Sequence, residues 1–253
     1  MTISGLTPDR KSIDPMISPE ISVDDCYFYH SMDIPGIGPV RGDWDLRGRF
    51  DEYTGHVPMA GKTVLDVGAA SGFLSMEAEQ RGAIVTSFDA EGSHQWQFLP
   101  NATGTEVFPL VFKKMRNSYL LAHLAFRSKA RAIYGDIYKL SEVAPPADIV
   151  LVALVLVHLS NPLEVIHQTS LLAKERLIIT EPSFAADQPL AVFAGTPPLT
   201  WWTFSNALYR QTLDMLGFRV IQESKSAYIC NDPRMSPSVD LWTFVAERRP
   251  SRL

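Results

Sequence analysis

A glycine-containing turn after an apolar segment is the part of this chain best suited to bind a ligand. The run from Thr63 to Leu74 is β-branched and apolar, then turns through Gly68 and Gly72 into the start of a helix. Such a turn presents backbone N–H groups, and a Cβ at either glycine would block a ligand or forbid positive φ. Asp66 adds a carboxylate, which suits a cationic, amine-bearing ligand better than a pyrophosphate.

The next two predicted strands also end on an acid. Residues 84–88 lead to Asp89, placed where a Rossmann-like site binds ribose hydroxyls. Residues 132–134 lead through Gly135 to Asp136 and Ile137. Each aspartate alone could be a turn former, but three in this order predict one ligand site at the carboxyl edge of a parallel sheet.

His158 is the candidate general base. It follows the apolar strand predicted at residues 148–153 and is the only histidine at a predicted strand exit. Ligands of open α/β sheets bind beyond the carboxyl ends of the strands, and an imidazole titrates near neutrality. The alternative is a structural histidine that bonds a loop carbonyl.

The turn around Asp66, Gly68 and Gly72 resembles the first motif of class I S-adenosylmethionine-dependent methyltransferases, with Ala70 where many members have glycine. Further segments resemble the branch of the bacterial tRNA wobble-uridine carboxymethyltransferases and related methyltransferases of secondary metabolism. These segments are residues 29–33, 42–47, 135–140, 158–163 and 200–202, and the similarity extends over roughly residues 27–218.

The resemblance implies that S-adenosylmethionine is the cofactor and that a small-molecule acceptor is methylated, with O-methylation through His158 as the first hypothesis. N- or C-methylation, tRNA modification and a non-catalytic cofactor-binding module stay open. The implied cofactor contacts are Trp44, Arg47, Asp66, Gly68, Ala70, Gly72, Asp89, Ala90, Asp136, Ile137 and Ala153. Val157 replaces the aromatic residue usual before the histidine. The lysine-rich surroundings that hold carboxy-S-adenosylmethionine are absent from residues 29–49, which favours plain S-adenosylmethionine.

Aromatic residues near the site are candidates for acceptor binding. Trp201 and Trp202 follow a Pro-rich segment that is expected to be a loop, and adjacent tryptophans there cannot both face one core. One of them is expected to form a pocket wall, with loop packing as the alternative. Tyr29, His30 and Asn206 complete the predicted acceptor site.

The order of the predicted elements indicates the fold class. Strands alternate with helices over residues 58–253, which predicts an α/β, Rossmann-like, doubly wound sheet. The resemblance implies seven strands with the last antiparallel. Residues 1–57 are interpreted as an N-terminal tail and cap. The insertion 92–131, with helical periodicity over residues 106–131, is either a helical lid over the pocket or extra core packing.

Composition limits the partners. The chain has 253 residues, 46% of them hydrophobic, a formal net charge of -5 and no basic run, which argues against nucleic acid as a partner. Its two cysteines show no metal-ligand spacing, so no metal is predicted, and free thiols suit a reducing compartment. Without an apolar segment long enough to span a bilayer, we expect a cytoplasmic protein without membrane contact. Assembly as a homodimer stays open.

Overall fold

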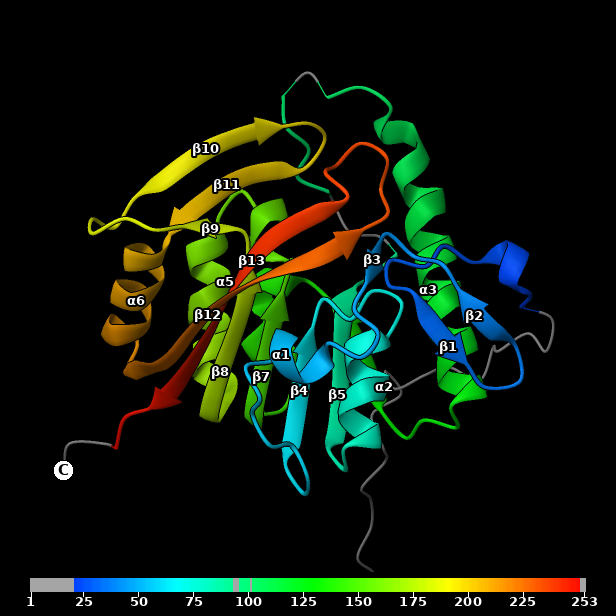
Figure 1. Ribbon diagram of the computed structural model, residues 1–253, viewed down its shortest axis with the longest axis horizontal. Helices are drawn as coiled ribbons and strands as arrows, with labels where there is room; N and C mark the ends of the chain where they lie inside the picture. Colours follow the sequence, from blue (N-terminus) through cyan, green and yellow to red (C-terminus); the bar gives the residue numbers. More distant parts are fainter. Residues whose placement is uncertain (1–20, 93–95, 101, 251–253) are drawn as a thin grey trace, which may run out of the picture.

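The computed structural model describes residues 21–92, 96–100 and 102–250, and its centre is one large mixed sheet (Figure 1). The eight strands of this sheet are, in spatial order, β3 (Trp44–Asp45), β12 (Phe218–Cys230), β13 (Ser238–Arg248), β8 (Ala173–Glu181), β7 (Ala147–Ala153), β4 (Thr63–Val67), β5 (Ile84–Ala90) and β6 (Arg131–Gly135). Strands β4 to β8 pair in parallel, and β13 is antiparallel to both of its neighbours. The carboxyl ends of the parallel strands therefore share one edge.

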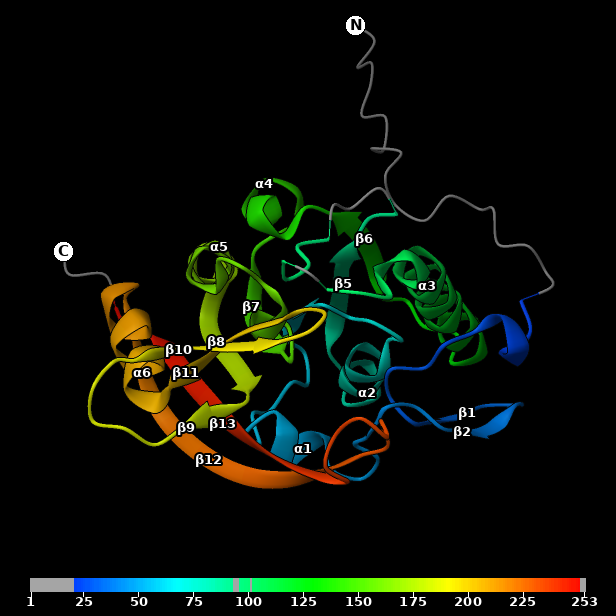
Figure 2. The same ribbon diagram turned by 90° about the horizontal axis from the view of Figure 1, so that it is seen from above.

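Helices cover both faces of the sheet, as the view from above shows (Figure 2). One face carries α1 (Phe50–Tyr53), α2 (Phe73–Gln80) and α3 (Phe108–Ala125), and the other carries α4 (Leu140–Val143), α5 (Pro162–Leu172) and α6 (Asn206–Met215). Strand β7 lies between these layers and is buried at five of its seven positions, because its apolar run has no polar face. The result is a three-layer α/β/α arrangement.

Several short elements lie outside the central sheet. They are η1 (Val23–Asp25), the hairpin β1 (Met32–Ile34) and β2 (Gly38–Val40), η2 (Thr105–Val107), η3 (Ile137–Lys139), η4 (Leu156–His158), and a small sheet of β9 (Ser183–Phe184), β10 (Ala191–Thr196) and β11 (Thr200–Ser205). In Figure 1 the β10–β11 hairpin arches above the ends of the central strands. It thereby forms one wall of the region where a ligand is expected.

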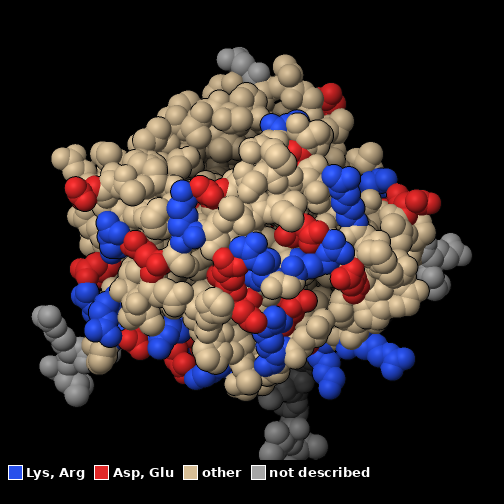
Figure 3. Space-filling view, viewed as in Figure 1, with Lys and Arg blue, Asp and Glu red and all other residues tan. Residues whose placement is uncertain are grey.

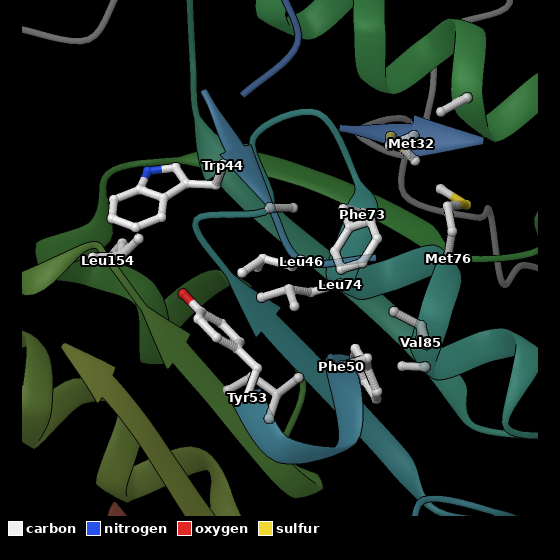
Figure 4. Packing of buried hydrophobic residues seen from close by; sticks show 14 of the residues in the cluster. Met32, Trp44, Leu46, Phe50, Tyr53, Phe73, Leu74, Met76, Val85 and Leu154 are labelled. Atoms are coloured by element: carbon white, nitrogen blue, oxygen red, sulfur yellow. The ribbon is translucent and has the colours of Figure 1, made fainter. Parts of the chain in front are cut away.

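The seven predicted strands are all present, and the last one, β13, is antiparallel as predicted. The strand count was wrong by one, because the two-residue strand β3 of the N-terminal segment pairs with β12. The segment predicted as a cap packs into the main hydrophobic core: Figure 4 shows Phe50 and Tyr53 against Leu74. The predicted tail, residues 1–21, lies outside the described residues except for Ile21.

The predicted insertion contains a shorter helix than its periodicity indicated. Helix α3 ends at Ala125, because Arg127 has a positive φ of 52° and β6 begins at residue 131. Its buried Tyr119 donates a hydrogen bond to Ser87 of β5 and also lines a cavity, together with Pro109 and Phe112 near the start of the helix. The same helix thus packs against the core and forms a wall of the cavity, and closure as a lid stays a prediction. Among the described residues no helix could span a bilayer.

Candidate functional site

The glycine turn has the backbone conformation that its residues predict. Gly68, Ala70 and Gly72 all have positive φ, at 81°, 48° and 88°. A Cβ on Gly68 would come within 2.3 Å of the Val155 side chain, so this position needs glycine for space as well as conformation. Ala70 adopts the left-handed region although it carries a Cβ, which accounts for the glycine usual at this position in the resembling family.

The carboxylate of Asp89 joins this turn to the end of β5. Its Oδ2 accepts a hydrogen bond from the Ala70 N–H at 2.6 Å, and its Oδ1 accepts one from the Ala90 N–H at 2.7 Å. Burial raises the pKa of Asp89, and these two hydrogen bonds oppose the rise. Each carboxylate oxygen retains acceptor capacity for a further donor. The pair of oxygens therefore suits a ligand with two neighbouring hydroxyls.

Asp66 lies on the other side of the turn and is almost fully buried, with 1% of its surface exposed. The Ser75 hydroxyl donates to its Oδ2 at 2.6 Å, but its Oδ1 has no hydrogen-bond partner among the described residues. Burial raises the pKa of Asp66 to about 6. A buried acceptor without a partner is rare and destabilising, so it marks a position where a ligand donor would be stabilised.

Asp136 and Ile137 occupy the end of β6 as predicted. Asp136 is the N-cap of η3 and accepts a hydrogen bond from the Tyr138 N–H at 3.0 Å, while the Ile137 side chain is buried. Ala153 ends β7, next to the glycine-turn strand β4. The parallel sheet therefore brings the ends of β4, β5, β6 and β7 to one edge, where the four predicted cofactor segments meet.

A cavity of about 360 Å³ opens beside Asp89, between the ends of β5 and β6 and the start of α3. Its walls include Tyr134, Arg116 and the stacked rings of Trp96 and Phe112, whose centroids are 3.6 Å apart. Asp136, Ile137 and His158 do not line it. It thus adjoins only the Asp89 side of the predicted site.

His158 lies in η4, directly after β7. Its Nδ1 is buried and lacks a hydrogen-bond partner within the described part of the chain. Burial lowers the pKa of His158, and a hydrogen bond with the Leu199 backbone acts in the opposite direction. The imidazole is therefore neutral near pH 7, with one ring nitrogen free. The Leu199 contact also fits the structural alternative for this histidine.

Glu181 holds the turn that carries His158. This fully buried residue ends β8, and its Oε1 accepts hydrogen bonds from the Val155 and Leu156 N–H groups, both at 2.8 Å. Its Oε2 has no partner in the described ranges, and burial raises the pKa of Glu181 to about 8. The side chain is consequently neutral at pH 7. Position at a strand end was the only signal for it in the sequence.

The two tryptophans lie on a strand, so the prediction of a loop was wrong. Both are in β11, where consecutive side chains point to opposite faces. The Trp201 indole N–H donates to the Gln97 carbonyl at 2.7 Å, and that of Trp202 donates to the Ser160 carbonyl at 3.0 Å. Trp202 packs against the hydrophobic core. The bond to Ser160 holds β11 beside the end of η4, and nothing in the sequence pointed to Gln97 as the partner of Trp201.

Asn206 begins α6 and is buried. Its side-chain carbonyl accepts a hydrogen bond from the Ser183 hydroxyl at 2.6 Å, which ties α6 to β9. It is not among the residues that line the cavity beside Asp89. Its predicted contact with an acceptor stays a prediction.

Two predicted residues of the N-terminal segment lie at the turn. The backbone N–H of His30 donates to the Ser71 hydroxyl at 3.1 Å, and burial lowers the pKa of the His30 imidazole to about 3. Tyr29 packs edge-on against His30, with ring centroids 4.9 Å apart. His30 is thus a neutral, buried neighbour of the predicted cofactor site.

Trp44 and Arg47 differ in their surroundings. Trp44 is buried with its ring beside Leu154, the residue that follows β7 (Figure 4). Arg47 is half-exposed and pairs with Asp45 at 2.6 Å and Asp33 at 2.9 Å. The guanidinium predicted to meet the cofactor carboxylate is therefore held by two carboxylates of the protein.

On the face shown in Figure 3, a hollow lies beneath an upper region almost free of charged side chains. Below the hollow, cations and anions are interspersed. Many charged side chains of the protein are paired with each other, as in the ion pairs Arg210–Glu223 and Lys225–Asp240. The charge pattern of this face differs from the contiguous basic surface that a nucleic-acid backbone requires.

The chain is similar in sequence to a curated protein over a short segment. No family model matches the chain. A segment of 53 residues is 49% identical to a ubiquinone biosynthesis O-methyltransferase of Pseudomonas paraeruginosa, and it covers 21% of this chain and 19% of that protein. The chain thus aligns with about a fifth of the length of this curated relative.

Solved structures match over most of the chain. The magnesium protoporphyrin IX methyltransferase of Synechocystis with bound S-adenosylmethionine has a TM-score of 0.53 and 18% identity, over 80% of this chain and 77% of that one. The 1,6-didemethyltoxoflavin-N1-methyltransferase of Burkholderia thailandensis has a TM-score of 0.52 and 17% identity, over 81% and 78%. The chain has the Rossmann-like fold of class I methyltransferases.

Proposed function

We propose that this protein is an S-adenosylmethionine-dependent methyltransferase that acts on a small-molecule acceptor, by O-methylation with His158 as general base. The observation that carries the proposal is the pair of carboxylates on either side of the glycine turn. Asp66 offers one buried, unpartnered oxygen, and Asp89 offers two oxygens fixed by backbone N–H groups. An amine and a vicinal diol are the groups that these acceptors fit.

The remaining contacts follow from the strand order. Asp66 would bind the ammonium group of the cofactor, Asp89 its ribose hydroxyls, and Asp136 with the Ile137 N–H its adenine. Trp44 and Tyr29 lie next to Leu154 and His30 and would enclose the methionine part. Because Arg47 is already paired, a cofactor carboxylate there would have to compete with Asp45 and Asp33.

When bound, S-adenosylmethionine supplies a methyl group on a sulfonium. The protein then has to place the acceptor in line with this group and take the hydroxyl proton. The free Nδ1 of His158 is the proposed proton acceptor, and Glu181 keeps the η4 turn in place. A lowered pKa supports this role, since a base must be unprotonated before the reaction.

The aromatic surface of the β10–β11 hairpin favours an apolar or ring-bearing acceptor. Phe193 is 56% exposed and lies within 5.5 Å of the Trp202 ring and 6.4 Å of the Trp201 ring, between centroids. The curated relative is named an O-methyltransferase, whereas the toxoflavin enzyme is an N-methyltransferase. The position of His158 favours the oxygen acceptor, because a hydroxyl needs a base.

Calorimetric titration with S-adenosylhomocysteine tests cofactor binding. Asp89→Ala should weaken binding about tenfold to a hundredfold, because one charge-assisted hydrogen bond contributes about 1.5–3 kcal/mol. Asp148→Ala is the matched control. Its carboxylate also accepts a backbone N–H, from Thr63 at 2.8 Å, but at the opposite edge of the sheet. Equal affinity of the wild type and Asp89→Ala would overturn the assignment.

Methyl transfer itself is tested by the formation of S-adenosylhomocysteine from S-adenosylmethionine with a panel of phenols and hydroxylated ring compounds. The proposal expects turnover with at least one of them. Tight cofactor binding without product from any acceptor would favour the non-catalytic module instead. Product formed only with tRNA would favour an RNA substrate.

A further inference from the structure

A buried chain of hydroxyl groups connects α3 with the carboxylate of Asp66. The Tyr119 hydroxyl is 2.8 Å from Ser87 Oγ, which is 2.7 Å from Ser75 Oγ, and Ser75 Oγ is 2.6 Å from Asp66 Oδ2. The four residues come from α3, β5, α2 and β4, and all of them are buried. The chain therefore joins four elements at the predicted cofactor site.

The proton of each hydroxyl has a defined direction. Ser75 donates to Asp66, so the hydrogen bond between the two serines must be donated by Ser87. Tyr119 in turn donates to Ser87. All three hydroxyls thus point toward Asp66, and their bonds end on Oδ2. The opposite oxygen, Oδ1, is the one left without a partner among the described residues.

We propose that Tyr119 is a positioning residue for the ammonium group of the ligand, and that it acts through Ser87 and Ser75 on Asp66. The inference rests on the proposed function, since the ammonium group is that of the methionine part of the cofactor. Donors aligned along a chain stabilise negative charge at its end. The chain thereby favours the ionised carboxylate and fixes Oδ1 as the atom that receives the ligand N–H.

The groups around Asp66 disfavour its ionised form, so the donated hydrogen bonds are needed to stabilise it. Asp89 on β5 acts in the same direction as burial and raises the pKa of Asp66, while hydrogen bonding by Ser75 of α2 lowers it. Tyr53 of α1 lies within electrostatic range, and the register partner on β7 is the apolar Leu151. Tyr119 is the titratable group of α3 in this network. No cation offsets Asp89 among the causes of this shift.

The ring of Tyr119 has a second role that separates packing from hydrogen bonding. A Cβ at Gly72 would lie 2.9 Å from this ring, so the ring fills the space that the glycine leaves at the start of α2. Tyr119→Phe keeps this contact and removes only the hydroxyl. The variant is therefore expected to fold with an unchanged circular dichroism spectrum.

The test compares two ligands as a function of pH. S-Adenosylhomocysteine carries the ammonium group, whereas 5′-methylthioadenosine has the adenosine and the thioether but no amino acid part. With the pKa of Asp66 at about 6, the affinity of the wild type for S-adenosylhomocysteine should fall below pH 6 and be constant near pH 8. The affinity for 5′-methylthioadenosine should not follow this curve.

Tyr119→Phe should raise the pH at which the affinity for S-adenosylhomocysteine begins to fall by about half a unit to one unit. Binding of this ligand should then be about two- to fivefold weaker at pH 6. At pH 8 the affinity should equal that of the wild type within about 10%. Binding of 5′-methylthioadenosine should be unchanged at both pH values. The double variant Tyr119→Phe/Ser87→Ala should match Ser87→Ala, because both substitutions interrupt one chain.

Tyr134→Phe is the control. Tyr134 lies on β6 and lines the same cavity as Tyr119, but its hydroxyl is outside the chain to Asp66. The inference would be overturned, while the proposed function stands, if the affinity for S-adenosylhomocysteine fell at the same pH in the wild type and in Tyr119→Phe. An equal change of this pH in Tyr134→Phe would also overturn it. If neither ligand binds the wild type at any pH, the proposed function itself fails.

Discussion

Asp66→Asn is expected to stabilise the protein at neutral pH while it weakens cofactor binding. Burial raises the pKa of Asp66 from 3.8 to about 6 in the folded state. Between these two values the native state binds more protons than the unfolded state. The free energy of unfolding therefore falls as the pH rises through this window. The shift of about 2.2 units corresponds to ~3 kcal/mol of destabilisation at pH 7.5.

Asparagine retains an acceptor for Ser75 but places an amide N–H₂ where Oδ1 has no partner among the described residues. An unsatisfied buried donor costs about 1–3 kcal/mol, so the net gain at pH 7.5 should be about 0–2 kcal/mol. The stability gain of the variant over the wild type is best compared between pH 4 and pH 7.5, because the cost of the unsatisfied donor is the same at both pH values and cancels. The difference should amount to about 2–3 kcal/mol in favour of the variant at the higher pH.

Urea unfolding of both proteins at several pH values between 4 and 7.5 measures this difference. Asp148→Asn is the control, since hydrogen bonds from the backbone and side chain of Thr63 lower the pKa of Asp148. Its loss should destabilise the protein at neutral pH. Parallel stability curves for the wild type and Asp66→Asn would refute the reasoning that this carboxylate is held at a raised pKa. Calorimetry should then show weaker S-adenosylhomocysteine binding in the same variant.

Further predictions concern the acceptor side of the site. His158→Ala should lower kcat about 10²–10⁴-fold with nearly unchanged cofactor affinity. His167→Ala, on the exposed side of α5, is the control and should retain wild-type turnover. Wild-type turnover in His158→Ala would exclude His158 as the general base. Glu181→Gln should raise the free energy of unfolding at neutral pH, and this gain should grow from about pH 4.5 to pH 8 and then level off. If urea unfolding shows no such pH dependence, Glu181 is not held neutral by burial. Trp202→Ala should chiefly raise the KM for the acceptor, and a loss confined to kcat would show that it does not bind the acceptor. In gel shifts, tRNA should bind weakly and dissociate by physiological salt, so specific binding that resists salt would contradict a small-molecule role.

The sequence predicted the central sheet because its signals are local. An apolar run such as residues 149–153 has to be buried on both faces, and Gly82 ends α2 with a φ of 84°, as a residue after a helix end should. The strand β3 could not be predicted, since two residues carry no periodicity and their pairing depends on β12. The same holds for β10, whose pairing with β11 follows from tertiary contacts.

The positions of the acidic residues at the strand ends were predictable, but their hydrogen-bond partners were not. A carboxylate at a strand end can be read from the position of Asp66, Asp89 or Asp136 relative to an apolar segment. The chain from Tyr119 to Asp66 joins residues 53 positions apart, and the sequence offers no pattern that links a helix tyrosine to a strand serine. Likewise, the ion pair of Arg47 with Asp33 depends on how the β1–β2 hairpin folds back toward β3.

The most direct test of the central claim is a crystal structure of the protein grown with S-adenosylhomocysteine. We predict the ligand amine within hydrogen-bond distance of Asp66 Oδ1, the ribose hydroxyls on Asp89, and the adenine beside Asp136 and Ile137. Ligand density elsewhere, or an amine that does not contact Asp66, would contradict it.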